Sequence, residues 1–314
     1  MNILVTGGAG FLGRHLCKYL KDVGHSITIV DCLTYAADPE VVKEYEFVNK
    51  LCQSLNPSSL PNKQYDVLIH LASDSHVDNS IEYPRRFVES NVVGTLNMLE
   101  VARFLKIKTF VQMSTDEVTG PIAFDAPRTH EKSPMNTSSP YAASKAGAEL
   151  LALSYRKTYG MDVRVVRSTN LYGCGQHPEK FLPRSITHGL LGWPIKVFGN
   201  GENRRSWLSV LDLCDGFDLV INKGKPGEVY SFGGVEHSNN NLAGAIAETL
   251  KVSVERVADR PGHDSRYSMD TSKVEALGWK RECSLIDNLP ALIHWYDKNR
   301  AWWDQAVKRG GKWS

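Results

Sequence analysis

The sequence predicts an α/β fold, a doubly wound parallel sheet with a smaller substrate-binding region. Three observations support this prediction. Short apolar segments alternate with helical patterns through the first half of the chain, a glycine-rich turn follows the first apolar segment, and the alternation stops after residue 168. The 314 residues are enough for one large α/β domain or two smaller ones.

The expected strands are short, apolar and bounded by turn residues. They are residues 2–6, 26–31, 45–48, 66–71, 108–114 and 162–168. Apolar residues recur at helical spacing in segments 11–21, 85–105 and 140–159. The last two segments are apolar on more than one face. That pattern favours a partner subunit that covers the second apolar face. The alternative is that each helix is enclosed within one chain.

The second half of the chain has a different composition. Gly, Pro, Asn and Trp are frequent in residues 173–201 and again in residues 222–234. We therefore expect a cofactor domain made of residues 1–170 plus about 205–232. A substrate-binding domain would comprise about 171–204 plus 233–314.

Composition and charge exclude several classes of protein. The net charge of +2 provides no basic field for nucleic acid. No apolar run reaches the ~20 residues of a membrane span, and no secretory leader is present, so we expect a cytoplasmic protein without a membrane partner. The cysteines are spread singly, which argues against a metal site or disulfide framework: Cys17, Cys32, Cys52, Cys174, Cys214 and Cys283.

The opening segment, MNILVTGGAGFLG, predicts a dinucleotide site of the Rossmann type. Gly7 allows a tight turn, Gly10 lets backbone N–H groups approach a pyrophosphate, and Gly13 permits close packing of helix on strand. An ordinary strand-to-helix turn would also use glycine, but this one follows the first strand of a βαβ series. Phe11 and Leu12, at the start of the helix, are expected beside the cofactor.

Asp31 at the end of the second strand favours NAD over NADP. Its carboxylate can accept hydrogen bonds from the ribose hydroxyls and would repel a 2′-phosphate. No Arg or Lys occurs in the four residues that follow it.

Tyr141 and Lys145 lie four residues apart in a predicted helix, so their side chains share one face. A free phenol has a pKa near ~10, but an ammonium and a cationic nicotinamide would stabilise the phenolate. We therefore expect Tyr141 to act as a base. For an isolated pair of this kind, a Tyr and a Lys on a surface helix would be the default interpretation.

Thr115, Asp116 and Glu117 follow the fifth predicted strand, at the edge of the sheet where such folds bind ligands. Thr115 could hydrogen-bond the reacting hydroxyl. Two carboxyl groups beside it indicate a second acid/base step, in which one donates while the other accepts. In isolation, an Asp-Glu pair at a strand end is more often a turn or helix cap.

At these residues the chain resembles the extended short-chain dehydrogenases, and more narrowly the nucleoside-diphosphate-hexose 4,6-dehydratases. Related epimerases and decarboxylases commonly lack the Thr-Asp-Glu triplet. The resemblance extends over nearly the whole chain, through HLASDSHVDNSI, NVVGT, NLYG, PEK, RSWL and DRPGHDSRYSMD.

The resemblance implies a lyase that uses NAD as an internal redox cofactor, with Leu71 and Ala72 beside that cofactor. Tyr141, assisted by Thr115 and Lys145, would deprotonate the sugar 4-hydroxyl as hydride leaves C4. Glu117 would then take the C5 proton, Asp116 would protonate the departing 6-hydroxyl, and hydride would return to C6.

The resemblance also implies a nucleotide-sugar substrate and a homodimer with a four-helix interface. The residues expected to bind the substrate are Asn170, Lys180, Arg205, Arg266 and Tyr267. Thr119, Asp74 and the segment 49–51 differ from the usual pattern, and residues 120–139 form a shorter segment than in many relatives. The alternatives are an NDP-sugar 4-epimerase, a 5,6-dehydratase and a non-catalytic NAD sensor.

Overall fold

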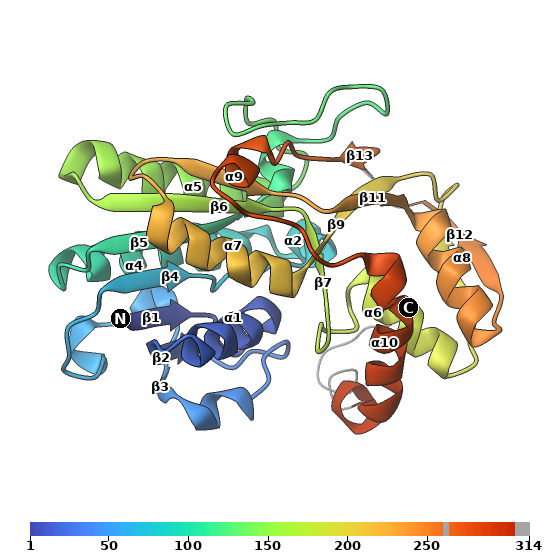
Figure 1. The fold of residues 1–314 in the computed structure, drawn as a ribbon, viewed down its shortest axis with the longest axis horizontal. Coiled ribbons are helices and arrows are strands. Elements are labelled where there is room, and N and C mark those ends of the chain that lie inside the picture. Colours follow the sequence, from blue (N-terminus) through green and yellow to red (C-terminus); the bar gives the residue numbers. More distant parts are fainter. Residues whose placement is uncertain (260–263, 305–314) are drawn as a thin grey trace.

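The computed structural model describes residues 1–259 and 264–304. A parallel sheet of seven strands forms its larger lobe (Figure 1). From one edge to the other the strands are β10 (Val229–Phe232), β6 (Asp162–Ser168), β5 (Thr109–Thr115), β4 (Val67–His70), β1 (Asn2–Thr6), β2 (Ser26–Asp31) and β3 (Glu46–Asn49). The strand order reverses between β1 and β4, and ligands of such sheets bind beyond the carboxyl ends of the strands at this point.

Helices cover both faces of this sheet because its strands are apolar on both sides. Ile3 and Val5 pack with α1 (Phe11–Asp22) and α7 (Val210–Lys223). Leu4 faces the opposite layer, formed by α4 (Gly94–Phe104) and α5 (Pro140–Tyr159). The predicted doubly wound parallel sheet is confirmed.

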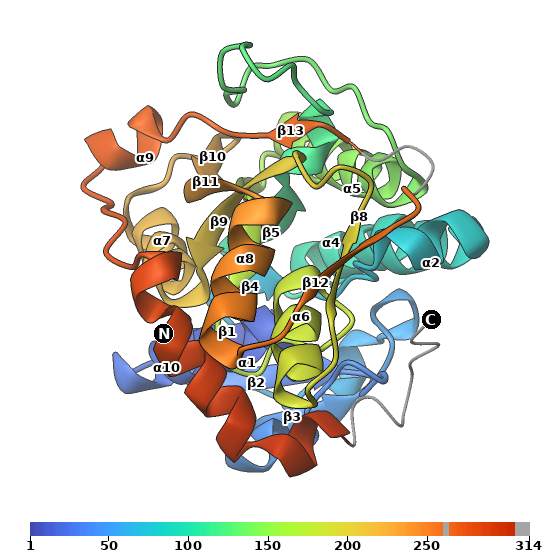
Figure 2. The ribbon, with the colours of Figure 1, turned by 90° about the vertical axis from the view of Figure 1, so that its right-hand side faces the viewer.

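The smaller lobe is built around strand β9 and a layer of helices (Figure 2). Its strands are β7 (Asn170–Tyr172), β8 (Ile195–Phe198), β9 (Arg204–Ser209), β11 (Val235–Ser238), β12 (Val254–Val257) and β13 (Arg266–Tyr267). Its helices include α6 (Phe181–Leu190), α8 (Asn239–Leu250) and α10 (Leu285–Lys298), and α9 (Ser272–Ala276) packs against β10. Residues 260–263 and 305–314, assigned to the substrate domain on sequence, lie outside the described residues.

The six predicted strands all occur, each within one residue of its predicted ends. The predicted helix at 85–105 is instead divided. It comprises α3 (Pro84–Phe87), the π-helical segment η4 (Val88–Val93) and α4, and it follows the short helix α2 (Val77–Glu82). Apolar residues occur on more than one face of this segment, so their spacing did not distinguish the π-helical part from a continuous α-helix.

Short 3₁₀ turns complete the larger lobe: η1 (Val41–Glu44), η2 (Cys52–Ser54), η3 (Pro57–Ser59) and η5 (Asp116–Thr119). All six cysteines are free thiols, three buried and three half-buried. In residues 1–259 and 264–304, no helix combines the length and apolar character needed to cross a membrane.

Candidate active site

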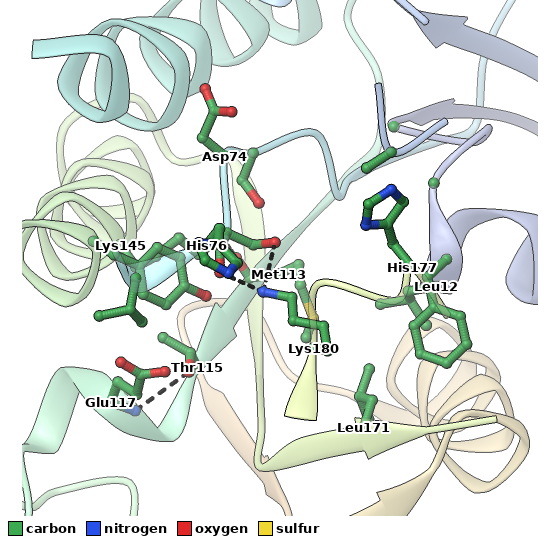
Figure 3. A pocket seen from close by; sticks show the side chains of 18 of the residues that line it. Leu12, Asp74, His76, Met113, Thr115, Glu117, Lys145, Leu171, His177 and Lys180 are labelled. Carbon is green, nitrogen blue, oxygen red and sulfur yellow. Dashed lines mark hydrogen bonds between the residues drawn. The ribbon is translucent and has the colours of Figure 1, made fainter. Parts of the chain in front are cut away.

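A cavity of about 620 Å³ lies at the carboxyl ends of the central strands and extends to the smaller lobe (Figure 3). Almost every residue predicted for catalysis or binding lines it. They are Gly7, Gly10, Phe11, Leu12, Gly13, Asp31, Leu71, Ala72, Thr115, Asp116, Glu117, Tyr141, Lys145, Asn170, Lys180, Arg205 and Tyr267.

The turn between β1 and α1 consists of three glycines and one alanine, so a phosphate group can approach its backbone closely. Gly7 has φ +72°, and a Cβ at Gly13 would lie 2.1 Å from the Gly7 carbonyl oxygen. Helix α1 begins directly after Gly10, which aims its first N–H groups and its positive dipole end at the cavity. This arrangement fits a pyrophosphate.

Asp31 is fixed at the cavity edge by two backbone hydrogen bonds. Its Oδ2 accepts from the Ala9 N–H at 3.0 Å, and its Oδ1 accepts from the Leu33 N–H at 2.9 Å. Burial raises the pKa of this carboxyl, while the backbone donors oppose the shift. Lys50 and Leu51, from the segment that departs from the family pattern, line the same cavity.

Thr115, Asp116 and Glu117 form the tight turn where β5 ends. The Thr115 hydroxyl donates to Asp116 Oδ1 at 3.1 Å, and the Glu117 N–H donates to the Thr115 hydroxyl at 3.3 Å. Burial, followed by the charge of Glu117, raises the pKa of Asp116 to about 7. The two carboxyl groups therefore differ in environment, as an acid and a base acting in turn would require.

Tyr141 lies in the first turn of α5, which is capped by the Ser139 hydroxyl and begins with Pro140. Burial, followed by the charge of Glu117, raises the pKa of Tyr141. A hydrogen bond with Thr115, rather than the expected ammonium of Lys145, opposes this shift. A bound oxidised nicotinamide ring would supply further positive charge to the phenolate, besides that of Lys145.

Lys145 is buried one helical turn beyond Tyr141. Its Nζ donates to the Met113 carbonyl at 2.8 Å, which ties α5 to the end of β5. Burial lowers the pKa of Lys145 to about 8, and the carboxylate of Glu149 opposes this shift.

The smaller lobe brings cationic groups to the opposite wall of the cavity. Lys180 precedes α6, and its Nζ reaches the Ser75 carbonyl of the larger lobe at 2.7 Å (Figure 3). The guanidinium of Arg205 lies 5.0 Å from the centre of the Tyr267 ring and donates to the Asp264 carbonyl at 3.0 Å.

Arg266 does not line the cavity. Its Nε and Nη2 donate to Glu236 at 2.7 and 2.8 Å, and its Nη1 donates to the Ala126 carbonyl at 2.7 Å. These contacts hold the 120–139 segment against β11. The structure therefore separates Arg266 from the other predicted substrate residues.

The comparisons with known proteins agree with this geometry. The model of the NAD dependent epimerase/dehydratase family matches residues 3–233. The chain belongs to this family. The resemblance drawn from the sequence motifs is confirmed.

Among relatives in the NAD dependent epimerase/dehydratase family, the dTDP-glucose 4,6-dehydratase of Streptomyces antibioticus is 40% identical, and the match covers 98% of this chain and 96% of the relative. The crystal structure of dTDP-glucose 4,6-dehydratase from Streptomyces venezuelae, with NAD bound, has a TM-score of 0.92 at 39% identity and covers 98% of this chain and 100% of its own. The UDP-glucose 4-epimerase of Thermotoga maritima has a TM-score of 0.90 at 27% identity, with coverage of 96% and 100%.

The sequence did not identify every residue that lines the cavity of this family member or that bonds to a lining residue. The Tyr35 hydroxyl donates to Glu179 Oε2 at 2.6 Å and so connects the loop after β2 with the smaller lobe. The Tyr267 hydroxyl donates to Asp264 Oδ2 at 2.7 Å, and Ser138 contacts both groups. The motifs PEK and DRPGHDSRYSMD contain Glu179 and Asp264, but nothing in the sequence indicated Tyr35 or Ser138.

Proposed function

We propose that this chain converts a dTDP- or UDP-linked hexose into the corresponding 4-keto-6-deoxy sugar, as an NAD-dependent 4,6-dehydratase. The observation that carries the proposal is the meeting of two sets of groups in one cavity. Tyr141 and Lys145 are suited to oxidation of a hydroxyl, and Asp116 and Glu117 are suited to elimination of water. A 4-epimerase needs only the first set.

The first step is oxidation at C4. Bound NAD would accept the C4 hydride and later return it to C6. Tyr141 removes the proton of the sugar 4-hydroxyl, Thr115 hydrogen-bonds the same oxygen, and Lys145 stabilises the phenolate by its charge. The product of this step is a 4-keto sugar, in which the C5 proton is acidic.

The second step is loss of water across C5 and C6. Glu117 removes the C5 proton, and Asp116 donates a proton to the 6-hydroxyl as the C6–O bond breaks. The raised pKa of Asp116 keeps this group protonated near neutral pH. When hydride returns to C6, Glu117 returns its proton to C5. The proton taken by Tyr141 balances the one lost from Asp116.

The two lobes would divide the binding of cofactor and substrate. The lobe that carries the glycine turn and Asp31 binds NAD. Asn170, Lys180, Arg205 and Tyr267 hold the diphosphate and nucleoside. Cationic groups and N–H donors suit phosphate oxygens, and Arg205 can contact them in a bidentate manner. An enzyme that uses these two metabolites is expected in the cytoplasm.

The active molecule would be a homodimer formed through α4, α5 and η4. Apolar side chains remain exposed on these elements, among them Val88 and Val93 on η4, Leu96 on α4 and Leu150 on α5, which are each 41–57% exposed. Two copies of this face would form a four-helix interface and cover them.

The test is product analysis by mass spectrometry and NMR after separate incubations with dTDP-glucose, UDP-glucose and UDP-N-acetylglucosamine in the presence of NAD. The proposal predicts loss of one water and a 4-keto-6-deoxy spectrum for one of them. Loss of water with alkene signals would indicate a 5,6-dehydratase, and an unchanged mass with inverted C4 would indicate an epimerase. NAD binding without any turnover would overturn the catalytic proposal.

A further inference from the structure

A fully buried ion pair lies behind the candidate catalytic residues. The carboxylate of Glu149 is 0% exposed and the guanidinium of Arg167 is 3% exposed. Arg167 Nη2 donates to Glu149 Oε1 at 2.5 Å, and Arg167 Nε donates to Glu149 Oε2 at 3.0 Å. The Ser114 hydroxyl donates to the same Oε2 at 2.6 Å. The carboxylate thus has three donors and one fixed orientation.

The pair is joined directly to the candidate active site. Glu149 follows Lys145 by four residues on α5, so both side chains project from the same face of the helix. Lys145 bonds the Met113 carbonyl and Glu149 accepts from Ser114, so the two side chains dock on consecutive residues of β5. The next residue of that strand is Thr115. Arg167 is the partner of Ser114 in the register between β5 and β6.

Packing alone does not account for a charge pair at this position. A buried ion pair pays a desolvation cost that apolar residues of similar volume avoid, so it is weak evidence for a role in stability. Lys145, in contrast, needs a counter-charge. Its side chain is buried, and its one hydrogen bond among the described residues is to the neutral carbonyl of Met113.

The charged and titratable groups around Lys145 leave Glu149 as its main source of negative potential. Tyr141 shares its helix. His70 on β4 is buried and neutral, with a pKa lowered to about 3. Asp116 and Glu117 face Tyr141. Glu149 is the group that opposes the fall in the pKa of Lys145, and Arg167 reaches the site from β6, behind Glu149.

We propose that Glu149 is a positioning residue that keeps Lys145 protonated during oxidation of the substrate, with Arg167 and Ser114 holding its carboxylate in place. The inference rests on the proposed function, because Lys145 matters only if Tyr141 acts as the base. Arg167 weakens the negative potential at Lys145, and the balance between the two charges sets the alkaline limit of the oxidation step.

Two single substitutions test this with opposite expected signs. Glu149→Gln leaves the Arg167 charge unopposed, so the pKa of Lys145 falls by about one unit or more. Arg167→Met leaves the Glu149 charge unopposed, so the same pKa rises. The double variant Glu149→Gln/Arg167→Met removes both charges and so leaves no unpaired buried charge. Its Lys145 should have a pKa between those of Lys145 in the wild type and in Glu149→Gln.

The direct readout is the NMR titration of ¹³C-labelled lysine in the NAD-bound protein, with the Lys145 signal assigned by its loss in Lys145→Met. The second readout is the pH profile of NADH formation in single turnovers with dTDP-glucose, measured in an Asp116→Asn background so that elimination does not interfere. The alkaline limb should move with the NMR pKa in each variant.

Shifts of the same sign in Glu149→Gln and Arg167→Met, or no shift in the folded double variant, would overturn the inference and leave a purely structural ion pair. Failure of the proposed function can be distinguished from failure of this inference. In that case the wild-type protein would not turn over the sugar nucleotide, while the lysine titration would still report on the field of Glu149.

Discussion

The Thr115 hydroxyl donates to Asp116 Oδ1 at 3.1 Å, while Asp116 Oδ2 is buried with no hydrogen-bond partner among the described residues. The second oxygen is therefore the atom that can carry a proton, and the turn at the end of β5 holds it at the cavity. Thr115 also contacts Tyr141. One hydroxyl thus connects the residue proposed for oxidation with the residue proposed for elimination.

The elimination step should lose rate as the pH rises through about 7, because Asp116 must be protonated to donate. Asp116→Asn should slow dehydration about 10²–10⁴-fold and leave oxidation at C4 largely intact. Stopped-flow absorbance of NADH and mass spectrometry of the sugar separate the two steps. Equal loss of both steps would refute a specific role for Asp116 in elimination.

Asp31→Asn should weaken NAD binding about 10–100-fold, because hydrogen bonds to a charged acceptor contribute ~1.5–3 kcal/mol. It should also reduce the discrimination against NADP, since the carboxylate no longer repels a 2′-phosphate. Calorimetric titration of the cofactor-free protein with each dinucleotide measures both effects. Asp22→Asn, at the exposed end of α1, is the control. An unchanged preference for NAD would contradict the role given to Asp31.

Gly13→Ala should abolish NAD binding or prevent folding, because the new Cβ would lie 2.1 Å from the Gly7 carbonyl oxygen and 2.6 Å from the Gly8 Cα. Gly244→Ala, inside α8, is the matched control. Its Cβ meets nothing within 4 Å, and it should stabilise the protein by up to ~1 kcal/mol. Thermal unfolding with and without NAD measures both variants. Normal NAD binding by Gly13→Ala would show that the turn is not the cofactor cradle.

Leu96→Glu and Leu150→Glu should each convert the proposed dimer to a monomer, because a charge buried in the four-helix interface has no partner there. Light scattering after size-exclusion chromatography gives the mass directly. Leu211→Glu changes a leucine on α7, outside this face, that is about as exposed as Leu150, and it should not affect the mass. A dimer that survives both substitutions would place the interface elsewhere.

The sequence predicted the larger lobe well because its signals are local. Each strand is a short apolar run, and Gly7 and Gly13 are required by close backbone approaches that other residues cannot make. The Thr115–Glu117 triplet and Tyr141 were found because each lies at the end of an element whose type was evident. The parallel sheet then brings these ends together.

Side-chain contacts within the smaller lobe and between the two lobes were not predictable from the sequence. The ion pair of Arg266 with Glu236 joins residues thirty positions apart, and an arginine in a binding motif does not indicate whether its donors are already engaged. The hydrogen bond of Tyr35 with Glu179 joins the two lobes across 144 positions of the sequence. Burial, followed by the charge of Glu117, raises the pKa of Tyr141. The four-residue spacing between Tyr141 and Lys145 in the sequence gives no information about either cause.

The most direct test of the proposed chemistry follows a single hydrogen atom. A nucleoside-diphosphate glucose labelled with deuterium at C4 is incubated with the NAD-loaded protein, and the product is examined by NMR and mass spectrometry. We predict that the deuterium moves to C6 of a 4-keto-6-deoxy product, because the hydride taken from C4 returns within the same active site. Deuterium retained at C4 with inverted configuration, or absent from C6 of the product, would contradict the assignment as a 4,6-dehydratase.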